Sequence, residues 1–281
     1  MSSWRVRKSR LFEAWAVGAG LLISGLFVIA ATGLLVRGFK GLSAEQGEAV
    51  REHPLLPRVL GTLILVATAA AVCVPISGAL ALVVSEAPRG RRFRRLAGVL
   101  LQAANATPSI VFGLFGFVVF VDLLGLGKSW LTGGLLLGWM SIPTLTAFWI
   151  EAMRAVPKEA RLAARGLGLS LERTALYVVL PRSLGGAWRG LSLALARAAG
   201  ETAPILFTAV VFSGPDLPTG VRNSPIVALP YHLFVLSQDT FDPAAERDAW
   251  TTALVLLALV VALYTAGLFV RRSAHEEARF A

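Results

Sequence analysis

The sequence predicts an all-α membrane protein of about six transmembrane helices, and three observations lead to that fold class. Hydrophobic residues make up 56% of the 281 residues, and the mean hydropathy of +0.68 is too high for an ordinary soluble domain. Six apolar stretches reach or approach the ~20 residues that a helix needs to cross a bilayer. Basic residues gather in alternate connections between these stretches, as the positive-inside rule requires.

The expected spans cover residues 15–36, 59–84, 96–121, 133–150, 191–211 and 249–270. The first follows a basic N-terminal segment, but its apolar stretch is too long for a signal peptide and lacks a cleavage site. We therefore interpret it as a retained span. The basic connections place both termini in the cytoplasm and predict contact with membrane lipid. Their distribution argues against nucleic-acid binding despite the net charge of +10.

The chain is expected to form one transmembrane domain over residues 1–281, with long connections on both sides of the membrane. Glycine and proline in the first external loop, residues 37–58, predict irregular structure around at most one short helix. The second long external loop covers residues 212–248. Its apolar middle is too short to span, which predicts a re-entrant or interfacial helix.

The cytoplasmic connection, residues 151–190, predicts two short helices that meet at a glycine. The first helix follows Pro157 and stops at Gly168, because glycine is the residue most often found after a helix C-terminus. Ser170 is a good N-cap for the second helix, and Pro181 is expected to end it. The pattern alone leaves open whether this element is a compact docking knob or only a connector.

Arg197 and Glu201 are charged residues inside the expected fifth span, where an unpaired charge costs several kcal/mol. Four residues separate them, so on a helix they share one face, and Pro204 and Thr208 are expected to continue that face. Thr202 lies between Glu201 and Pro204. We interpret this stripe as the path of a polar substrate, against the alternative of a static ion pair that staples helices together.

The expected third span carries Asn105 and Ser109 on one face, and Pro108 interrupts its hydrogen bonding. Two glycines, Gly113 and Gly116, allow a neighbouring helix to approach closely. The polar residues either line the substrate pathway or hydrogen-bond within the helix packing, and the sequence does not decide between these roles.

Three motifs make the chain resemble the permease subunits of ABC importers, and phosphate importer permeases of the PstA type in particular. The first is the spacing of the cytoplasmic connection, and the second is the segment from Arg197 to Pro204. The third combines residues 108–116 within the third span with residues 228–232 before the last span. The matching positions are Pro157, Ala163, Ala164, Gly168, Leu180 and Pro181, then Arg197, Gly200, Glu201, Thr202 and Pro204, then Pro108, Ser109, Gly113, Gly116, Ala228, Pro230 and His232.

This resemblance implies a type I ABC-importer permease with the MetI-like fold, in a bacterial inner membrane. It implies a heterodimer with a second permease, two ATP-binding subunits, an external phosphate-binding protein, and inorganic phosphate as substrate. No GxxxxGK[ST] phosphate loop occurs in the sequence, so the chain is expected to be no enzyme and to bind no cofactor itself. ATP and Mg would be held by the partner ATPase.

The resemblance also assigns the ATPase contact to the cytoplasmic connection. The positions are Glu159, Leu162, Ala163, Ala164, Gly168, Leu180 and Pro181. Leu162 stands where the family has a glutamate, so the acidic contact is missing or displaced to Glu159. Within the substrate pathway, the resemblance favours Arg197 as a bidentate ligand of phosphate oxygens.

Three other functions compete with this hypothesis. A permease for another oxyanion, such as molybdate or phosphonate, fits the same residues. A membrane-embedded transferase would need a polar catalytic cluster at one interface, and none is visible in the sequence. A pure assembly scaffold gives no reason for intramembrane charge. No metal site is predicted, and the single cysteine, Cys73, allows no intrachain disulfide.

Overall fold

The computed structural model describes residues 3–45, 55–86, 90–211, 218–239 and 242–277, and within these ranges it contains helices and turns but no strand. The N-terminal half contains α1 (Ser3–Glu45), α2 (Leu55–Ser85), α3 (Arg91–Ala106), α4 (Ser109–Gly116), the π-helical turn η2 (Phe117–Leu123) and α5 (Trp130–Arg154). The C-terminal half contains α6 (Lys158–Gly166), α7 (Leu171–Thr174), the π-helical turn η3 (Ala175–Val179), α8 (Leu180–Gly200), α9 (Ala203–Thr208), α10 (Leu229–Leu236) and α11 (Pro243–Glu277).

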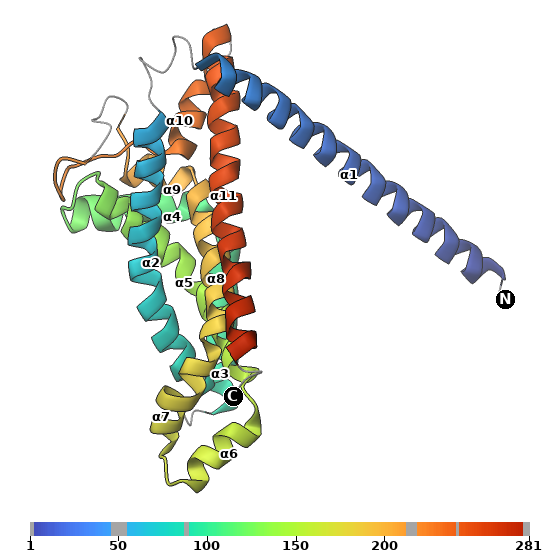
Figure 1. The fold of residues 1–281 in the computed structure, drawn as a ribbon, viewed down its shortest axis with the longest axis vertical. Coiled ribbons are helices and arrows are strands. Elements are labelled where there is room, and N and C mark those ends of the chain that lie inside the picture. The colour runs from blue at the N-terminus through green and yellow to red at the C-terminus, as the bar shows by residue number, and fades with distance from the viewer. Residues whose placement is uncertain (1–2, 46–54, 87–89, 212–217, 240–241, 278–281) are drawn as a thin grey trace.

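Helices α2, α5, α8 and α11 run side by side as an elongated bundle (Figure 1). α5 is its centre, since 72% of its most apolar window is buried. Two apolar clusters fill the bundle. One surrounds Leu137 and Ile205 near α9 and α10, and the other surrounds Leu145 and Trp149 toward α6 and α7. The short helices α6 and α7 project from one end of the bundle, and α10 caps the other end (Figure 1).

Four helices among the described residues are long and apolar enough to cross a membrane: α1 from Trp15 to Ser43, α2, α5, and α11 from Pro243 to Leu268. The α3–α4–η2 segment is a fifth candidate if it is counted as one broken span. The fifth expected span, residues 191–211, falls on α8 and α9. α8 runs the length of the bundle, and Arg189 and Arg197 lower its apolar character.

The expected third span is not one straight helix. α3 and α4 are bent by 92° at Thr107 and Pro108, so the prediction that Asn105 and Ser109 share a helix face is wrong. Pro108 has no N–H to continue the helix, and the residue before a proline disfavours the α conformation. Thr107 accordingly has an extended backbone, with φ −69° and ψ 130°.

The first helix is longer than the sequence predicts. α1 continues to Glu45, so the part of the expected loop 37–58 up to that residue is helical, while residues 46–54 lie outside the described residues. Near its C-terminal end, α1 packs on α11, where a Cβ on Gly38 would lie 2.7 Å from the Cβ of Leu254.

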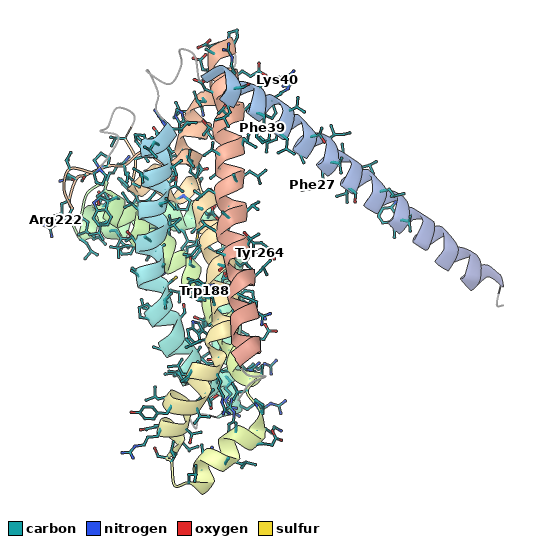
Figure 2. The ribbon with its side chains drawn as sticks, viewed as in Figure 1. Phe27, Phe39, Lys40, Trp188, Arg222 and Tyr264 are labelled. Atoms are coloured by element: carbon teal, nitrogen blue, oxygen red, sulfur yellow. The ribbon has the colours of Figure 1, made fainter. Side chains whose placement is uncertain are left out.

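The rest of α1 leaves the bundle at an angle (Figure 1). Its apolar side chains, including Phe27, stand free of the other helices (Figure 2). None of the apolar window of α1 is buried. A helix of this composition requires lipid or another protein around it.

The apolar middle of the expected loop 212–248 forms α10, as the sequence predicts. At eight residues α10 is too short to span. The buried hydroxyl of Thr62 on α2 accepts a hydrogen bond at 2.9 Å from the backbone N–H of Leu229, and donates one at 2.9 Å to the carbonyl of Arg58. The same end holds the buried His232, so the segment matched by the third motif is part of the packed core.

Candidate functional site: a charged pair at a helix break and a projecting two-helix element

Arg197 and Glu201 form an ion pair where α8 ends. The Arg197 Nε lies 3.2 Å from the Glu201 Oε1, and 46% of the Arg197 side chain and 16% of the Glu201 side chain are exposed. Arg197 stands in the last turn of α8, where a cation favours the negative end of the helix dipole. The predicted pairing is therefore present, and the guanidinium reaches the surface of the chain.

The expected continuation of this stripe through Pro204 and Thr208 is wrong. α8 ends at Gly200, Glu201 has an extended backbone with φ −78° and ψ 123°, and α9 begins at Ala203. The physical reason is Pro204: inside a continuous helix its ring would collide with the carbonyl of Gly200, four residues earlier. The chain therefore breaks before the proline.

Past the break, the predicted pathway residues turn inward. Pro204 is buried in the first turn of α9, and the buried Thr208 donates a hydrogen bond of 2.8 Å to the Pro204 carbonyl. Thr202 is the half-buried N-cap of α9. Glu201 adjoins a narrow crevice between α2, α5, α9 and α10, next to Thr62 and Pro230. The charged pair thus lies between an exposed face of α8 and a packed interior.

Of the predicted polar residues in the third span, Asn105 is exposed and is hydrogen-bonded to the neighbouring helix α5. Its Oδ1 accepts a bond of 2.7 Å from the hydroxyl of Thr144 on α5. Ser109 is the first residue of α4, beyond the bend. Among the described residues, no hydrogen bond or ion pair joins Asn105 or Ser109 to Arg197 or Glu201.

The two glycines of the third span do allow close approach, as predicted. A Cβ on Gly113 would lie 2.8 Å from the Phe207 ring and 3.1 Å from the Ala203 carbonyl, so α4 packs directly on α9. A Cβ on Gly116 would lie 2.4 Å from a methyl group of Leu136 on α5. α4 is consequently fixed against the helix that follows the break.

The projecting element has the two helices that the sequence predicts. Gly168 ends α6 with φ +85°, a conformation that favours glycine, and its N–H donates to the carbonyl of Arg165 at 2.9 Å. Ser170 caps α7 by accepting a hydrogen bond of 3.3 Å from the N–H of Arg173. The end of α6 and the start of α7 are therefore each determined by local residues, Gly168 and Ser170.

Pro181, by contrast, does not end the second helix, and that prediction is wrong. The backbone passes from α7 through η3 into α8 without leaving the helical region, with Pro181 in the first turn of α8. η3 is a π-helical turn, and its wider hydrogen-bonding pattern accommodates the missing proline N–H. Residues 171–200 thus form one continuous helical run from the projecting element to the charged pair.

The residues that the resemblance assigns to the ATPase contact form a mixed surface on this element. Leu162 is 65% exposed, Glu159 and Ala163 are also exposed on α6, and Ala164 is buried against the neighbouring segment. Pro181 is exposed and Leu180 half-buried. Several further apolar side chains project into the surroundings: Leu167, Leu171, Leu176 and Tyr177. Such a set of exposed apolar residues is typical of an interaction surface.

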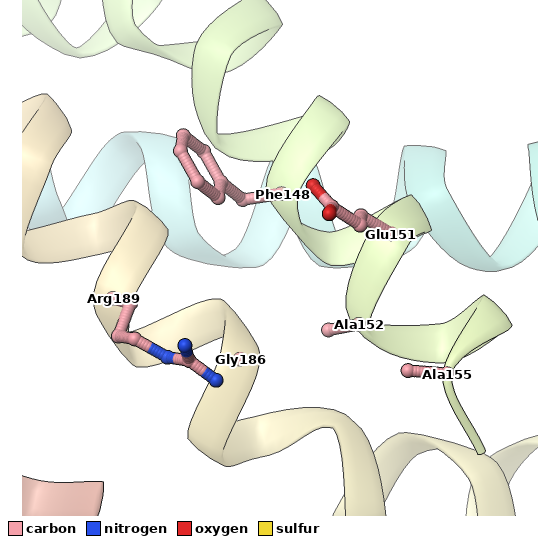
Figure 3. A pocket seen from close by; sticks show the side chains of 6 residues that line it. All are labelled: Phe148, Glu151, Ala152, Ala155, Gly186 and Arg189. Atoms are coloured by element: carbon pink, nitrogen blue, oxygen red, sulfur yellow. The ribbon is translucent and has the colours of Figure 1, made fainter.

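A cavity of about 190 Å³ lies between α5 and α8 at the same end of the bundle (Figure 3). The side chains of Glu151 and Arg189 face this cavity from opposite helices, and no hydrogen bond or ion pair of the described residues engages them. From the sequence, Arg189 is one of the basic residues of the cytoplasmic connection 151–190, and no site role is predicted for it. The glycines at Gly186 and Gly190, one helical turn apart, bring α8 close enough to α5 for these charges to face each other.

A bundle of apolar helices that holds a half-exposed ion pair at a helix break, with two short helices projecting from one end, is typical of a polytopic membrane transport protein. The sequence signature of the binding-protein-dependent transport system inner membrane components matches residues 74–274. The chain belongs to that family, and it is a multi-pass membrane protein.

Curated relatives and solved structures agree with this assignment. The chain is 27% identical to the phosphate transport system permease protein PstA 1 of Mycobacterium tuberculosis, over 89% of this chain and 80% of that protein. It is 31% identical to PstA 2 of Mycobacterium bovis, over 74% of this chain and 68% of that protein. The fold is similar to that of the MetNI methionine ABC transporter in inward-facing conformations, with a TM-score of 0.57 at 15% identity over 85% of this chain and 95% of that chain. The expected fold class and family are thus confirmed.

Proposed function

We propose that this chain is one of two permease subunits of an ATP-driven importer that moves inorganic phosphate into a bacterial cell. The observation that carries the proposal is the Arg197–Glu201 pair, which stands at a helix break with 46% of the Arg197 side chain exposed. Relatives named as phosphate transport permeases over most of the chain support phosphate as the anion.

The chemistry of the pair suits a phosphate pathway. In the empty state the Glu201 carboxylate neutralises Arg197, so neither charge stands unpaired in a membrane-spanning bundle. An arriving phosphate replaces that carboxylate on the planar guanidinium fork, which binds two of its oxygens at once. The displaced Glu201 accepts a hydrogen bond from the protonated oxygen of monohydrogen phosphate, a bond that fully ionised sulfate cannot donate.

The proposed assembly follows from two unpartnered surfaces. The exposed apolar length of α1 fits a second permease in the bilayer, since the described part of the bundle covers none of its apolar window. The α6–α7 element fits a groove on an ATP-binding subunit, with Leu162 and Glu159 at the contact. ATP and Mg then belong to that subunit, and an external phosphate-binding protein delivers the substrate to the α10 end.

We place the α6–α7 end in the cytoplasm. The C-terminal end of α11 lies at this end of the bundle (Figure 1), and the basic residues of α3, α6 and α7 gather there. With α1 and α11 as the first and last of six spans, an even total, both termini of the chain are then on the same, cytoplasmic side.

The decisive experiment is uptake of radiolabelled phosphate by the complex purified through a tag on this chain and reconstituted in vesicles with external binding protein and internal ATP. Arg197→Lys keeps the charge but removes the planar fork, and it is expected to lower uptake at least tenfold with assembly unchanged. Arg37→Lys is the matched control, because Arg37 forms a 3.3 Å ion pair with Glu246 that is more exposed and lies between α1 and α11.

If the Arg197–Glu201 ion pair only holds the helices together, Arg197→Lys is expected to keep normal uptake. An ion pair exposed to this degree contributes about 1 kcal/mol or less, so a purely structural role predicts a small loss of thermal stability and normal uptake in Arg197→Lys. Unchanged uptake in that variant would show that the pathway role is wrong. Molybdate or a phosphonate competing better than phosphate for uptake would show that the anion is wrong.

A further inference from the structure

A strongly basic pocket lies at the base of the α6–α7 element, away from the Arg197–Glu201 pair. It has a volume of about 300 Å³ and is lined from three places in the chain: the C-terminal end of α2, the first turn of α3, and the junction of α5 with α6. The buried side chains of Val84 and Val156 contribute apolar surface to it. Arg197 lies seventeen residues along α8 from Leu180, a distance of roughly 25 Å along the helix axis.

One of the four basic residues in this pocket is already neutralised. Arg161 on α6 donates from its NH1 to the carboxylate of Glu86, and from its NH2 to the backbone carbonyl of Met153 at 2.7 Å. Its side chain is only 24% exposed, so this pair ties α6 to the end of α2 and to the end of α5. Arg161 therefore has a structural role, and its charge is already paired with Glu86.

The other three basic residues converge without a partner. The side chains of Arg94, Arg154 and Lys158 line the pocket, and no hydrogen bond or ion pair engages them within the described part of the chain. With Arg161 matched by Glu86, they leave the pocket three positive charges in excess. Like charges held together in one concave site repel one another, and an anion placed between them removes that repulsion.

The chemistry of the three side chains selects the class of anion. Two guanidinium groups and one ammonium offer planar, multidentate donation to the oxygens of a phosphate group. A volume of this size is at the lower end of small-molecule sites and admits a phosphate group with room for a substituent. The apolar contribution of Val84 and Val156 accommodates the less polar side of a phosphoester.

We propose that this basic pocket binds a phosphate group, supplied either by inorganic phosphate or by the headgroup of an acidic phospholipid. The site lies outside the substrate pathway proposed above and does not depend on it. A bound phosphate would bridge Arg94 at the start of α3 to Lys158 at the start of α6, and so hold the projecting element in a fixed position on the bundle.

The test compares two variants that lose the same charge. In the first, Arg94→Gln and Lys158→Gln are combined, which removes two of the free cations of the pocket. In the second, Arg92→Gln and Arg173→Gln are combined, which removes exposed cations of α3 and α7 that do not line it. Each is purified as the full complex in nanodiscs, and its unfolding midpoint in chloride and circular dichroism establish that it is folded.

Two arms distinguish the source of the phosphate group. In the first, nanodiscs of phosphatidylcholine are titrated with inorganic phosphate against chloride at equal ionic strength. In the second, phosphatidylglycerol is introduced at increasing mole fraction without phosphate. In at least one arm, the unfolding midpoint of the wild-type complex is expected to rise with the logarithm of the probe concentration. The pocket variant is expected to need at least tenfold more probe for the same rise, and the control variant to match wild type.

Three results would overturn the proposal. The first is that neither probe raises the midpoint of the wild-type complex. The second is that the control variant loses the response as completely as the pocket variant, since general surface charge would then be responsible. The third is that the response survives in the pocket variant but disappears in Arg197→Gln, because the phosphate would then be bound in the pathway alone.

Discussion

The turn between α6 and α7 offers a sharp test of how the projecting element works, because two nearby glycines have opposite conformational requirements. Gly168 has φ +85°, in the left-handed region, whereas Gly166 is the last residue of α6. A Cβ added at either position would meet no atom within 4 Å. Alanine at either site therefore changes backbone preference without a steric clash.

The expected magnitudes follow from that difference. Gly168→Ala places an L-residue in the left-handed region, which costs about 1–2 kcal/mol, or a five- to thirtyfold shift away from the native turn. Gly166→Ala replaces a helical glycine by the best helix former and stabilises α6 by up to ~1 kcal/mol. Gly168→Asn is expected to recover most of the loss, because asparagine tolerates the left-handed conformation.

The assay is ATP hydrolysis stimulated by the loaded binding protein, together with phosphate uptake per ATP, in the reconstituted complex. Co-purification of the ATP-binding subunits reports docking. Gly168→Ala is expected to weaken docking and to lower stimulated hydrolysis severalfold, while Gly166→Ala retains wild-type values. If the two alanine variants behave alike, the geometry of this turn does not matter for coupling, and the docking role assigned to α6 and α7 is wrong.

Two further predictions concern the packing that holds the bundle together, and both are measured by thermal unfolding of the purified protein. Gly61→Ala is expected to destabilise the protein by about 1–3 kcal/mol, because the added Cβ would lie 2.0 Å from a backbone carbonyl in the segment before α10. The control is Gly98→Ala, whose Cβ would meet no atom within 4 Å, so this variant is expected to be neutral or stabilising. Equal midpoints for these two would contradict the close contact of α2 with that segment. Thr62→Val leaves a buried N–H at the start of α10 unsatisfied and is expected to cost about 1–3 kcal/mol. Thr68→Val removes only a hydrogen bond to its own helix, so a loss as large as that of Thr62→Val would refute the bridging role.

The spans and the local helix signals of this chain were predictable from the sequence. Hydropathy located α2, α5 and α11, since a bilayer-spanning helix needs a run of apolar residues and little else. The stop at Gly168 and the cap at Ser170 follow from backbone geometry that one residue determines. The Arg197–Glu201 pair follows from helical spacing alone, because both residues lie within one turn of the end of α8.

The prolines were less predictable, because packing decides what a proline does to a membrane helix. Pro75 and Pro143 lie inside α2 and α5, and both helices continue past them. Pro108 and Pro204 instead coincide with the 92° bend and with the break after Gly200. The missing hydrogen bond is the same in all four cases. The difference is that α2 and α5 pack along each other on both sides of their prolines, which the sequence does not reveal.

For the site residues outside α8, too, the sequence does not reveal which helices pack together. The sequence left open whether Asn105 lines the pathway or bonds to a neighbouring helix, and its hydrogen bond to Thr144 joins α3 to α5. Glu151 and Arg189 stand at opposite ends of the cytoplasmic connection 151–190, and the sequence does not reveal that they face one cavity. Pairing across helices depends on which faces pack together. In this chain that is set by close contacts at Gly186 and similar positions, which hydropathy alone does not identify.

The continuous helical run from Leu171 to Gly200 connects the projecting element to Arg197, whereas Glu201 lies just beyond the end of α8, next to the crevice between α2, α5, α9 and α10. A rotation of the projecting element therefore reaches the guanidinium more directly than the carboxylate, provided that η3 transmits it. Tyr177 in η3 is 72% exposed, so Tyr177→Gly and Tyr177→Ala lose the same contacts, but only glycine loosens the backbone. Tyr177→Gly is expected to lower phosphate uptake per ATP hydrolysed, whereas Tyr177→Ala keeps the wild-type ratio. An equal ratio in both variants would mean that η3 is not the connection that carries the movement to Arg197.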